Sequence, residues 1–167
     1  GEIRDRETAQ TAIEASLTGH LVFSTLHTND SPSAVARLVD IGVEAFLITG
    51  TLRAVIAQRL VRRVCSSCKV HYEPSDEVLR ELGLTQREVG GAKFARGKGC
   101  EICSFTGYKG RQGIAEVLIV DERLRRAILD HASTGDLRKL ALESGMKTLR
   151  QAGLRAVFEG TTSVEEG

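Results

Sequence analysis

The sequence predicts an α/β fold with an inserted zinc-binding subdomain and a helical C-terminal region. Three observations predict it: a short apolar segment between helical stretches, two C-x-x-C pairs, and three further helical stretches after the second pair. The chain has 167 residues, of which 41% are hydrophobic. That is enough for a packed core in one ordinary domain or two small ones.

A buried strand between two helices is expected in the N-terminal part. Glu7 to Thr18 carries apolar residues at helical spacing, and Gly19 suits the end of that helix. His20–His27 is apolar, rich in β-branched residues and too short for a helix, which predicts a buried strand. The next segment predicts a helix that Ser31 caps and Pro32 begins.

Further helices are expected on both sides of the cysteine pairs. One should run from about Glu44 to Arg59, with a break near Gly50, and a short one should lie within PSDEVLRELG. After a strand at Ile114–Val120, three helices are expected: Glu122–His131, Gly135–Glu143 and Leu149–Glu159. At the end of the chain, Ser163 and Glu166 have capping-box spacing with no helix after them, so we expect the sequence to be cut there.

The four cysteines form two pairs, Cys65/Cys68 and Cys100/Cys103, separated by the 31 residues 69–99. Four thiolates in this pattern favour a structural Zn²⁺ ion with no open coordination position. Two disulfides or four unrelated core thiols are the alternatives, and disulfides are disfavoured because the sequence has no secretory signal. His71 is a weaker candidate ligand, since a lone histidine more often serves another purpose.

Composition narrows the classes of partner. The formal net charge is +1, aromatic residues make up 4% and tryptophan is absent, so nucleic acid is not an expected partner. No apolar run approaches the roughly 18 residues of a membrane span. A cytoplasmic location is therefore expected.

Several motifs together carry a family likeness. GEIRDRETAQTAIEASLTGHLVFSTLHTND, AQRLVRRVC, the two cysteine pairs and GYKGRQGIAEVL resemble the motor ATPases of bacterial type II secretion and type IV pili. In that family GEIRDxET ends the Walker B strand and TGHLVxSTLHTN is the histidine box. The resemblance implies that Glu2 and His27 are catalytic: Glu2 positions the attacking water or a Mg²⁺-bound water, and His27 reaches toward the γ-phosphate. It also makes Arg4 and His20 candidate cofactor-binding residues.

The resemblance further implies a domain plan. The chain would be the C-terminal half of a RecA-like P-loop NTPase core (residues 1–64), a tetracysteine zinc subdomain (65–112), and a returning strand with a helical C-terminal region (113–167). The phosphate-binding loop G-x-x-x-x-G-K-[ST] is missing from the sequence, since the only Gly-Lys pair, Gly97-Lys98, is followed by Gly99. We therefore expect that loop upstream of Gly1, ATP and Mg²⁺ in the full-length protein, and no hydrolysis by this chain alone.

The implied partners are the other subunits of a homo-hexamer and an inner-membrane platform protein, with the assembled machine peripheral to that membrane. The implied work is pilin or pseudopilin assembly. The cysteine pairs favour pilus extension or secretion over retraction, and the choice between secretion, pilus assembly and DNA uptake stays open. Basic residues near the cysteines are candidates for subunit or platform contacts: Arg59, Arg62 and Arg63, which have no acid nearby in sequence, and Lys93, Arg96, Lys98, Lys109 and Arg111.

Two other classes of function are compatible with parts of the sequence. One is a zinc-ribbon module that binds a protein or nucleic acid and has no ATPase role. The other is a structural segment that only forms oligomers.

Overall fold

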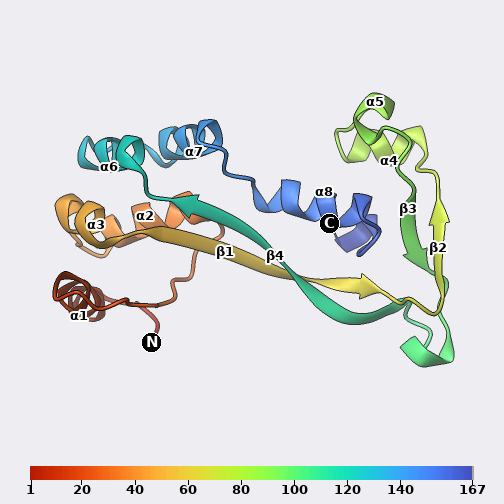
Figure 1. The fold of residues 1–167 in the computed structure, drawn as a ribbon, viewed down its shortest axis with the longest axis horizontal. Helices are drawn as coiled ribbons and strands as arrows, with labels where there is room; N and C mark the ends of the chain where they lie inside the picture. Colours follow the sequence, from red (N-terminus) through yellow and green to blue (C-terminus); the bar gives the residue numbers. More distant parts are fainter. Residues whose placement is uncertain (167) are drawn as a thin grey trace. The chain divides into compact units, whose positions relative to one another are not determined.

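In the computed structural model, which describes residues 1–166, the chain divides into two units with separate cores. Unit 1 comprises Gly1–Ala57 and Glu116–Thr148, and unit 2 comprises Gln58–Ala115 and Leu149–Gly167. Two long strands, β1 (Ala54–Val64) and β4 (Tyr108–Ile119), pair in a two-stranded sheet and run in opposite directions (Figure 1). Each of them contributes residues to both units.

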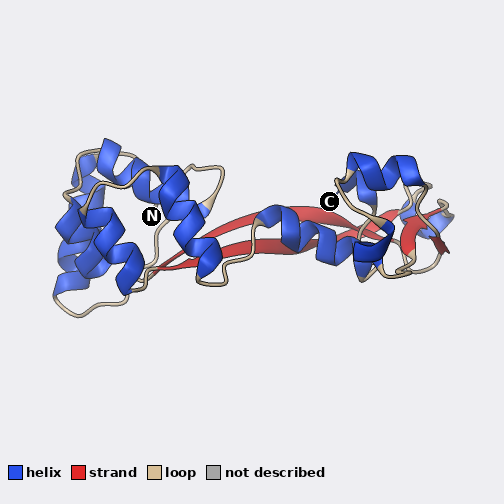
Figure 2. Ribbon diagram, turned by 90° about the horizontal axis from the view of Figure 1, so that it is seen from above, coloured by secondary structure: helices blue, strands red, loops and turns tan. Residues whose placement is uncertain are grey.

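Unit 1 consists mainly of helices (Figure 2). They are α1 (Arg6–Leu17), α2 (Ser31–Asp40), α3 (Ala45–Thr51), α6 (Glu122–Leu129) and α7 (Thr134–Glu143). Their apolar faces meet in one core, together with residues from the end of β4, and this core includes Val35, Ile48, Leu118, Leu124 and Leu137. The helices predicted at residues 7–18, 122–131 and 135–143 are thus confirmed, apart from shifts of one or two residues at most of their ends.

The cap of α2 differs from the prediction. Asp30, not Ser31, is the N-cap, and its carboxylate accepts a hydrogen bond of 2.9 Å from the Ser33 backbone N–H. Ser31 is the first helical residue and is fully buried. Its hydroxyl does not cap the helix, because it donates to Glu116. Pro32 lies in the first turn, as predicted.

The helix predicted from Glu44 to Arg59 is wrong in its second half. Helix α3 ends at Thr51, Leu52 is extended, and β1 begins at Ala54. The local pattern of this segment is compatible with a helix and with a strand, although β-branched Val55, Ile56 and Val61 favour a strand. Pairing with β4 decides between the two. Nothing in the local sequence indicates a partner more than forty residues away.

The buried strand predicted at His20–His27 is also wrong. Within the described residues this segment has a single parallel bridge, from Thr25 to Glu2, and it is largely exposed. Leu21 and Phe23 are 78% and 82% exposed. A buried strand needs neighbours on both sides and cover on both faces, whereas here only the short stretch around Glu2 and Ile3 lies beside the segment.

Unit 2 combines a small hairpin with short helices. Its elements are β2 (Lys69–Tyr72), α4 (Asp76–Glu81), α5 (Gln86–Val89), β3 (Phe94–Gly97), the 3₁₀ turns η1 (Glu101–Cys103) and η2 (Val164–Glu166), and α8 (Leu149–Phe158). Leu79, Val89, Phe94 and Val157 form its core. The helices predicted around 76–81 and at 149–159 are confirmed. Helix α8 packs with unit 2, so the C-terminal helices are divided between the two units.

The capping box predicted for Ser163 and Glu166 does not form. The Glu166 carboxylate instead accepts hydrogen bonds from Arg62, at 2.9 Å from its backbone N–H and at 2.9 and 2.6 Å from its guanidinium. Ser163 is buried, and its hydroxyl lies 2.6 Å from the Tyr108 hydroxyl. Arg62 is therefore not the unpaired basic residue that its sequence neighbourhood suggests.

No helix in residues 1–166 is both long and apolar enough to cross a membrane.

Candidate metal centre and carboxylate site

A hairpin brings the two cysteine pairs together. Strand β2 begins directly after Cys68, and β3 ends shortly before Cys100. The strands are antiparallel with Lys69 opposite Gly97, and the Lys98 N–H donates to the Cys68 carbonyl at 3.0 Å. The chain between the pairs thus folds out and returns to its starting point, as the 31-residue gap requires.

The four sulfurs are spaced as a tetrahedral metal site requires. All four Sγ atoms lie within 4.8 Å of one another. The distance is 4.0 Å between Cys65 and Cys100, 3.9 Å between Cys68 and Cys103, and 3.7 Å between Cys100 and Cys103. A metal at about 2.3 Å from each sulfur of a regular tetrahedron separates the sulfurs by about 3.8 Å. A disulfide needs about 2.05 Å, so the arrangement fits a shared ion and not two disulfides.

The thiols of this cluster do not ionise alike. Burial opposes ionisation of Cys103, but hydrogen bonds from the backbone N–H groups of Cys100 and Gly107 outweigh it and lower the pKa of Cys103 to about 6. Burial raises the pKa of Cys68 to about 11. Without a cation the cluster therefore favours partial ionisation, and a dication would favour the thiolate form of all four.

His71 is not part of this cluster. It lies on β2 opposite Ala95, with its side chain exposed, and the metal-ligating group found among the described residues contains only the four cysteines.

Close backbone contacts hold the second cysteine pair in place. A Cβ atom on Gly97 would lie 2.0 Å from the Gly107 carbonyl oxygen, and one on Gly99, at φ +89°, would lie 2.7 Å from the Phe105 carbonyl oxygen. The Cys65 N–H donates to the same Gly107 carbonyl at 2.9 Å. Only glycine permits this approach of the two chain segments.

Gly97→Ala is therefore expected to destabilise unit 2. The new methyl group would have to displace backbone atoms, at a cost at or above the ~1–3 kcal/mol typical of overpacking. Gly113→Ala is the matched control, since Gly113 lies on β4 and a Cβ atom added there would meet nothing within 4 Å. Thermal unfolding of both variants measures the effect, and equal melting temperatures would contradict it.

The second candidate site lies where residues 1–4 pass the end of the His20–His27 segment. The Ile3 N–H donates to the Thr25 carbonyl at 2.9 Å, which sets Glu2 beside Thr25. From there Glu2 reaches two cationic or donor groups. Its Oε1 lies 2.8 Å from His27 Nε2, and its Oε2 lies 2.7 Å from Arg4 Nη2. The structure therefore brings together three of the four residues predicted for nucleotide chemistry.

The carboxylate of this site is held in its charged form. The hydrogen bond from Arg4 is the main cause that lowers the pKa of Glu2, and the same contact raises the pKa of Arg4. The Glu2 side chain is 21% exposed, whereas that of His27 is 88% exposed. An ionised, partly covered carboxylate beside an open imidazole can accept a proton or orient a water molecule.

His20 lies apart from this group. Its Nδ1 is 3.1 Å from the Thr18 hydroxyl and 3.2 Å from the Ala15 carbonyl, at the C-terminal end of α1. Within the described residues its polar contacts are with that helix end.

One buried residue of unit 1 was missed by the sequence prediction. Glu116 is 1% exposed and contacts Ser31 at the start of α2. The signal that could have found it is an acidic residue inside the apolar strand segment IAEVLIV.

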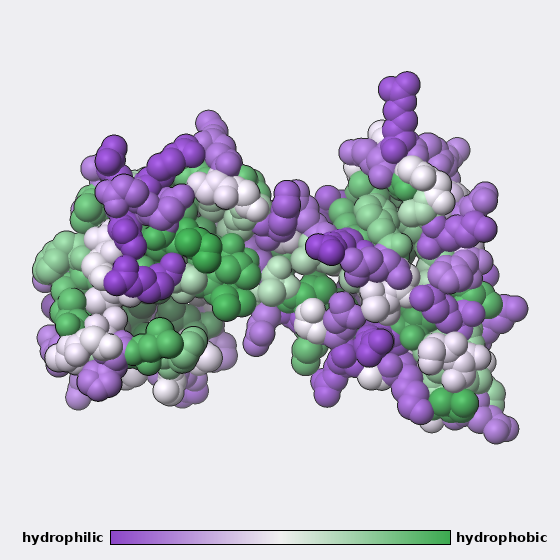
Figure 3. Space-filling view, viewed as in Figure 1, coloured by the Kyte–Doolittle hydropathy of each residue, from purple (hydrophilic) through white to green (hydrophobic). Residues whose placement is uncertain are grey.

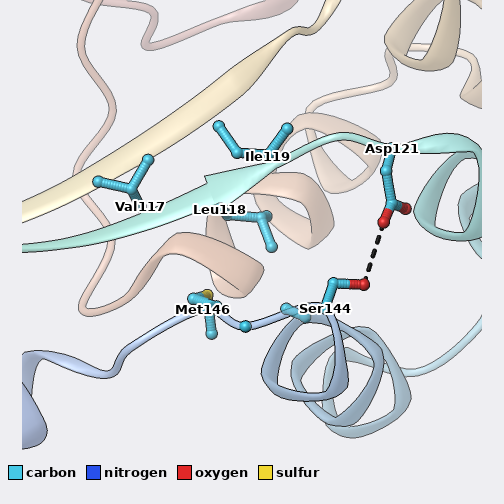
Figure 4. A pocket seen from close by; sticks show the side chains of 8 residues that line it. Val117, Leu118, Ile119, Asp121, Ser144 and Met146 are labelled. Atoms are coloured by element: carbon cyan, nitrogen blue, oxygen red, sulfur yellow. Dashed lines mark hydrogen bonds between the residues drawn. The ribbon is translucent and has the colours of Figure 1, made fainter.

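A separate cavity of about 370 Å³ lies between β4 and the residues at the end of α7 (Figure 4). Its lining is mostly apolar and includes Leu118 and Met146. The one carboxylate there, Asp121, already caps α6 and accepts a hydrogen bond of 3.0 Å from Ser144. The cavity therefore offers no group free for catalysis.

Exposed apolar and basic side chains are distributed differently. Hydrophobic side chains reach the surface of unit 1 in Figure 3, and Leu17, Phe46 and Ile119 are among the exposed ones. In unit 2, Lys93, Arg96 and Lys98 are exposed, and the Arg96 guanidinium lies 5.3 Å from the Tyr72 ring centroid. The contact surface predicted for these basic residues stays a prediction.

Comparison with solved structures places the chain among proteins with an α/β ATPase-like fold. Residues 1–167 match the family model described as Type II/IV secretion system protein, and the chain belongs to that family.

Relatives in this family carry names from both pilus assembly and secretion. The chain is 52% identical over 166 residues to the type IV pilus assembly ATPase PilB of Thermus thermophilus, and 47% identical over 166 residues to the type II secretion system protein HxcR of Pseudomonas aeruginosa. It is covered to 99% in both matches, and it spans 19% of the first protein and 31% of the second.

Solved structures agree on the fold. The Legionella pneumophila ATPase DotB superposes on this chain with a TM-score of 0.62 and is 25% identical to it in sequence. The pilus retraction motor PilT with bound ADP superposes with a TM-score of 0.62 and is 24% identical. In both cases 99% of this chain and 36% of the other chain are covered. These matches support an α/β ATPase-like fold.

Proposed function

We propose that this chain is part of an ATP-hydrolysing motor that drives pilin or pseudopilin assembly in type IV pilus extension or type II secretion. The contact of 2.8 Å between Glu2 and His27 carries the proposal, because it puts the two motif residues into one site. The names of the relatives support it, since they include pilus assembly ATPases and secretion proteins. The family match over the whole chain disfavours the zinc-ribbon alternative, in which the N-terminal motifs are coincidental.

In this mechanism Glu2 acts on the attacking water. Its ionised carboxylate accepts a hydrogen bond from that water and aligns it for attack on the γ-phosphate. His27 is exposed enough to turn from Glu2 toward a phosphate oxygen, and Arg4 stays at the other oxygen of the carboxylate. A Mg²⁺ ion bound with ATP would neutralise the charge that develops on the phosphates. His20 is left without a role in this mechanism, since its contacts are at the end of α1.

The four cysteines would hold a structural Zn²⁺ ion. The spacing of their sulfurs supports a tetrahedral site, and four protein thiolates leave no position for a reacting water. The metal would fix the β2–β3 hairpin and would take no part in hydrolysis.

The assembled protein would be a homo-hexamer at the cytoplasmic face of the inner membrane, in contact with a platform protein. DotB, an ATPase, and PilT, a pilus retraction motor, have a similar fold. The exposed Lys93, Arg96 and Lys98 of unit 2 are the proposed contact residues.

The test compares this chain with the full-length protein. Residues 1–167 contain no G-x-x-x-x-G-K-[ST] loop, which is the element that cradles the nucleotide phosphates, so we expect ATP turnover by the full-length protein and none by this chain alone. Phosphate release from equal molar amounts of both measures it. A full-length protein that binds nucleotide but releases no phosphate would contradict the proposal.

A further inference from the structure

A buried carboxylate in unit 1 has no role in the mechanism above. Glu116 lies on β4 and is 1% exposed. Burying a carboxyl group is unfavourable unless hydrogen bonds compensate for the lost water. A leucine at this position would fill the core at no such cost. The hydrogen bonds that Glu116 makes are therefore the feature to explain.

Two of those bonds go to a single residue at the start of α2. Glu116 Oε1 accepts from the Ser31 backbone N–H at 2.9 Å and from the Ser31 hydroxyl at 2.5 Å. The hydroxyl also lies 3.5 Å from Met146 Sδ, but it has one hydrogen, and the carboxylate oxygen at the shorter distance is a better acceptor than a thioether sulfur. Ser31 is itself fully buried, so Glu116 fixes both the backbone and the side chain of the first residue of α2.

A second contact holds the neighbouring residue. Asp30 caps α2 through Oδ1, and its Oδ2 lies 2.6 Å from Arg138 Nη2 on α7. Residues 30 and 31 are thus tied to β4 and α7, which lie about a hundred residues further along the chain.

These anchors lie close in sequence to His27. Only Thr28, Asn29 and Asp30 separate His27 from Ser31, and the Thr28 hydroxyl donates to the Asp30 carbonyl at 3.2 Å. The His27 side chain is 88% exposed, and Glu2 is the partner found for it among the described residues. Packing therefore does little to orient the His27 side chain. Its backbone is held from two sides: before it, the Thr25 carbonyl accepts from the Ile3 N–H and Leu26 packs against the core of unit 1. After it, the chain is fixed at Ser31.

We propose that Glu116 is a positioning residue: by fixing the start of α2 through Ser31, it directs His27 toward Glu2. This inference rests on the proposed function, because it concerns the same site. A Cα shift of the order of an ångström at a catalytic side chain is enough to lower a rate by about a hundredfold.

The first test uses this chain and the NMR signals of its histidine rings. Glu116→Gln keeps the shape and one carbonyl acceptor but removes the charge, and Ser31→Ala removes the hydroxyl donor. Both should shift or broaden the His27 ring signals and leave those of His71 and His131 unchanged. Asp121→Asn is the matched control: it also changes a carboxylate that anchors a helix of unit 1, but it caps α6 and should leave His27 unchanged.

A merely structural role gives a different result. All three variants would then lower the melting temperature, and the His27 signals of the folded variants would stay at the wild-type position. That outcome would overturn the inference. Should Glu116→Gln fail to fold, Ser31→Ala decides, because it adds no polar atom to the core and keeps the backbone N–H donor.

The second test uses the full-length protein. Glu116→Gln should lower kcat by on the order of tenfold with KM changed less than about twofold, because nucleotide still binds while His27 is misdirected. Unchanged kcat with unchanged His27 signals would refute the positioning role. Full turnover by Glu2→Gln would refute the proposed function instead, and the ring signals of His27 would then still decide whether Glu116 orients it.

Discussion

Glu2→Gln in the full-length protein is expected to lower ATP turnover by about a hundredfold or more, with nucleotide binding retained. Positioned acid–base groups contribute typically 10²–10⁴ in rate, and glutamine keeps the shape of the side chain while it loses the charge that attracts a water proton. The native carboxylate is ionised at neutral pH, and the Arg4 contact, which lowers the pKa of Glu2, favours the ionised form further. Steady-state phosphate release and the affinity for a labelled nucleotide separate the two effects.

The control for this experiment is Glu14→Gln. Glu14 is an exposed residue on α1 outside the GEIRDxET motif, so its replacement makes the same chemical change without touching His27 or Arg4. Its turnover should stay within about twofold of wild type. If Glu2→Gln turned over as fast as Glu14→Gln, Glu2 would not be the catalytic carboxylate.

Helix positions were predictable from the sequence where the local signals agreed. The helices from Glu122 and from Leu149 have amphipathic patterns and clear borders, and the structure has them within about a residue of the expected start. The sequence predicts Ser31 as the N-cap of α2, one residue after the N-cap in the structure, Asp30, because aspartate and serine are both favourable at that position. What decides between them is the buried Glu116, which engages the serine and which no local pattern reveals.

The pairing of the strands was not predictable from the sequence. The local sequence of β1 is compatible with a continuation of α3, and β2 and β3 have only four residues each, which is too short for a clear strand pattern. In both cases the conformation depends on a partner distant in sequence. The meeting of the four cysteines was predictable in spite of this, because two C-x-x-C pairs are typical of one shared metal site whatever the path of the chain between them.

The carboxylate site was predictable only through the family resemblance. Glu2 and His27 lie 25 positions apart, and neither carries a local signal that distinguishes it from a surface residue. Their meeting depends on the bridge between Glu2 and Thr25. The resemblance also suggested His20, whose place at the end of α1 separates it from the others.

Removal of the metal is expected to unfold the hairpin of unit 2 and to leave unit 1 folded. Binding of structural Zn²⁺ contributes about 10–16 kcal/mol in small zinc domains, which is comparable with the entire stability of an ordinary domain. The hairpin has four residues in each strand and a core of only a few residues, so it has little else to hold it. Unit 1 has its own larger core and no residue in the cysteine cluster.

Hydrogen exchange measures this prediction residue by residue. After chelation, the amides of β2 and β3 should lose protection while those of α1 and α2 keep it. Cys100→Ser should reproduce the loss without a chelator, and His71→Ala, on the same hairpin but outside the cluster, should not. If the amides of β2 and β3 stayed protected after complete metal removal, the hairpin would not depend on a metal and the prediction would be wrong.

The same site predicts how stability depends on pH. The pKa of Cys103 is lowered from 9.0 to about 6, so the folded state favours its thiolate. The stabilisation from this thiolate is complete above pH 9, declines as the pH falls, and is lost below about pH 6. Metal binding also requires thiolates, so protons displace the metal and its contribution to stability falls as the pH falls. Unit 2 should therefore release its metal and unfold on acidification before unit 1 does, because the ligands of unit 2 must be ionised to bind and the core of unit 1 depends on apolar packing.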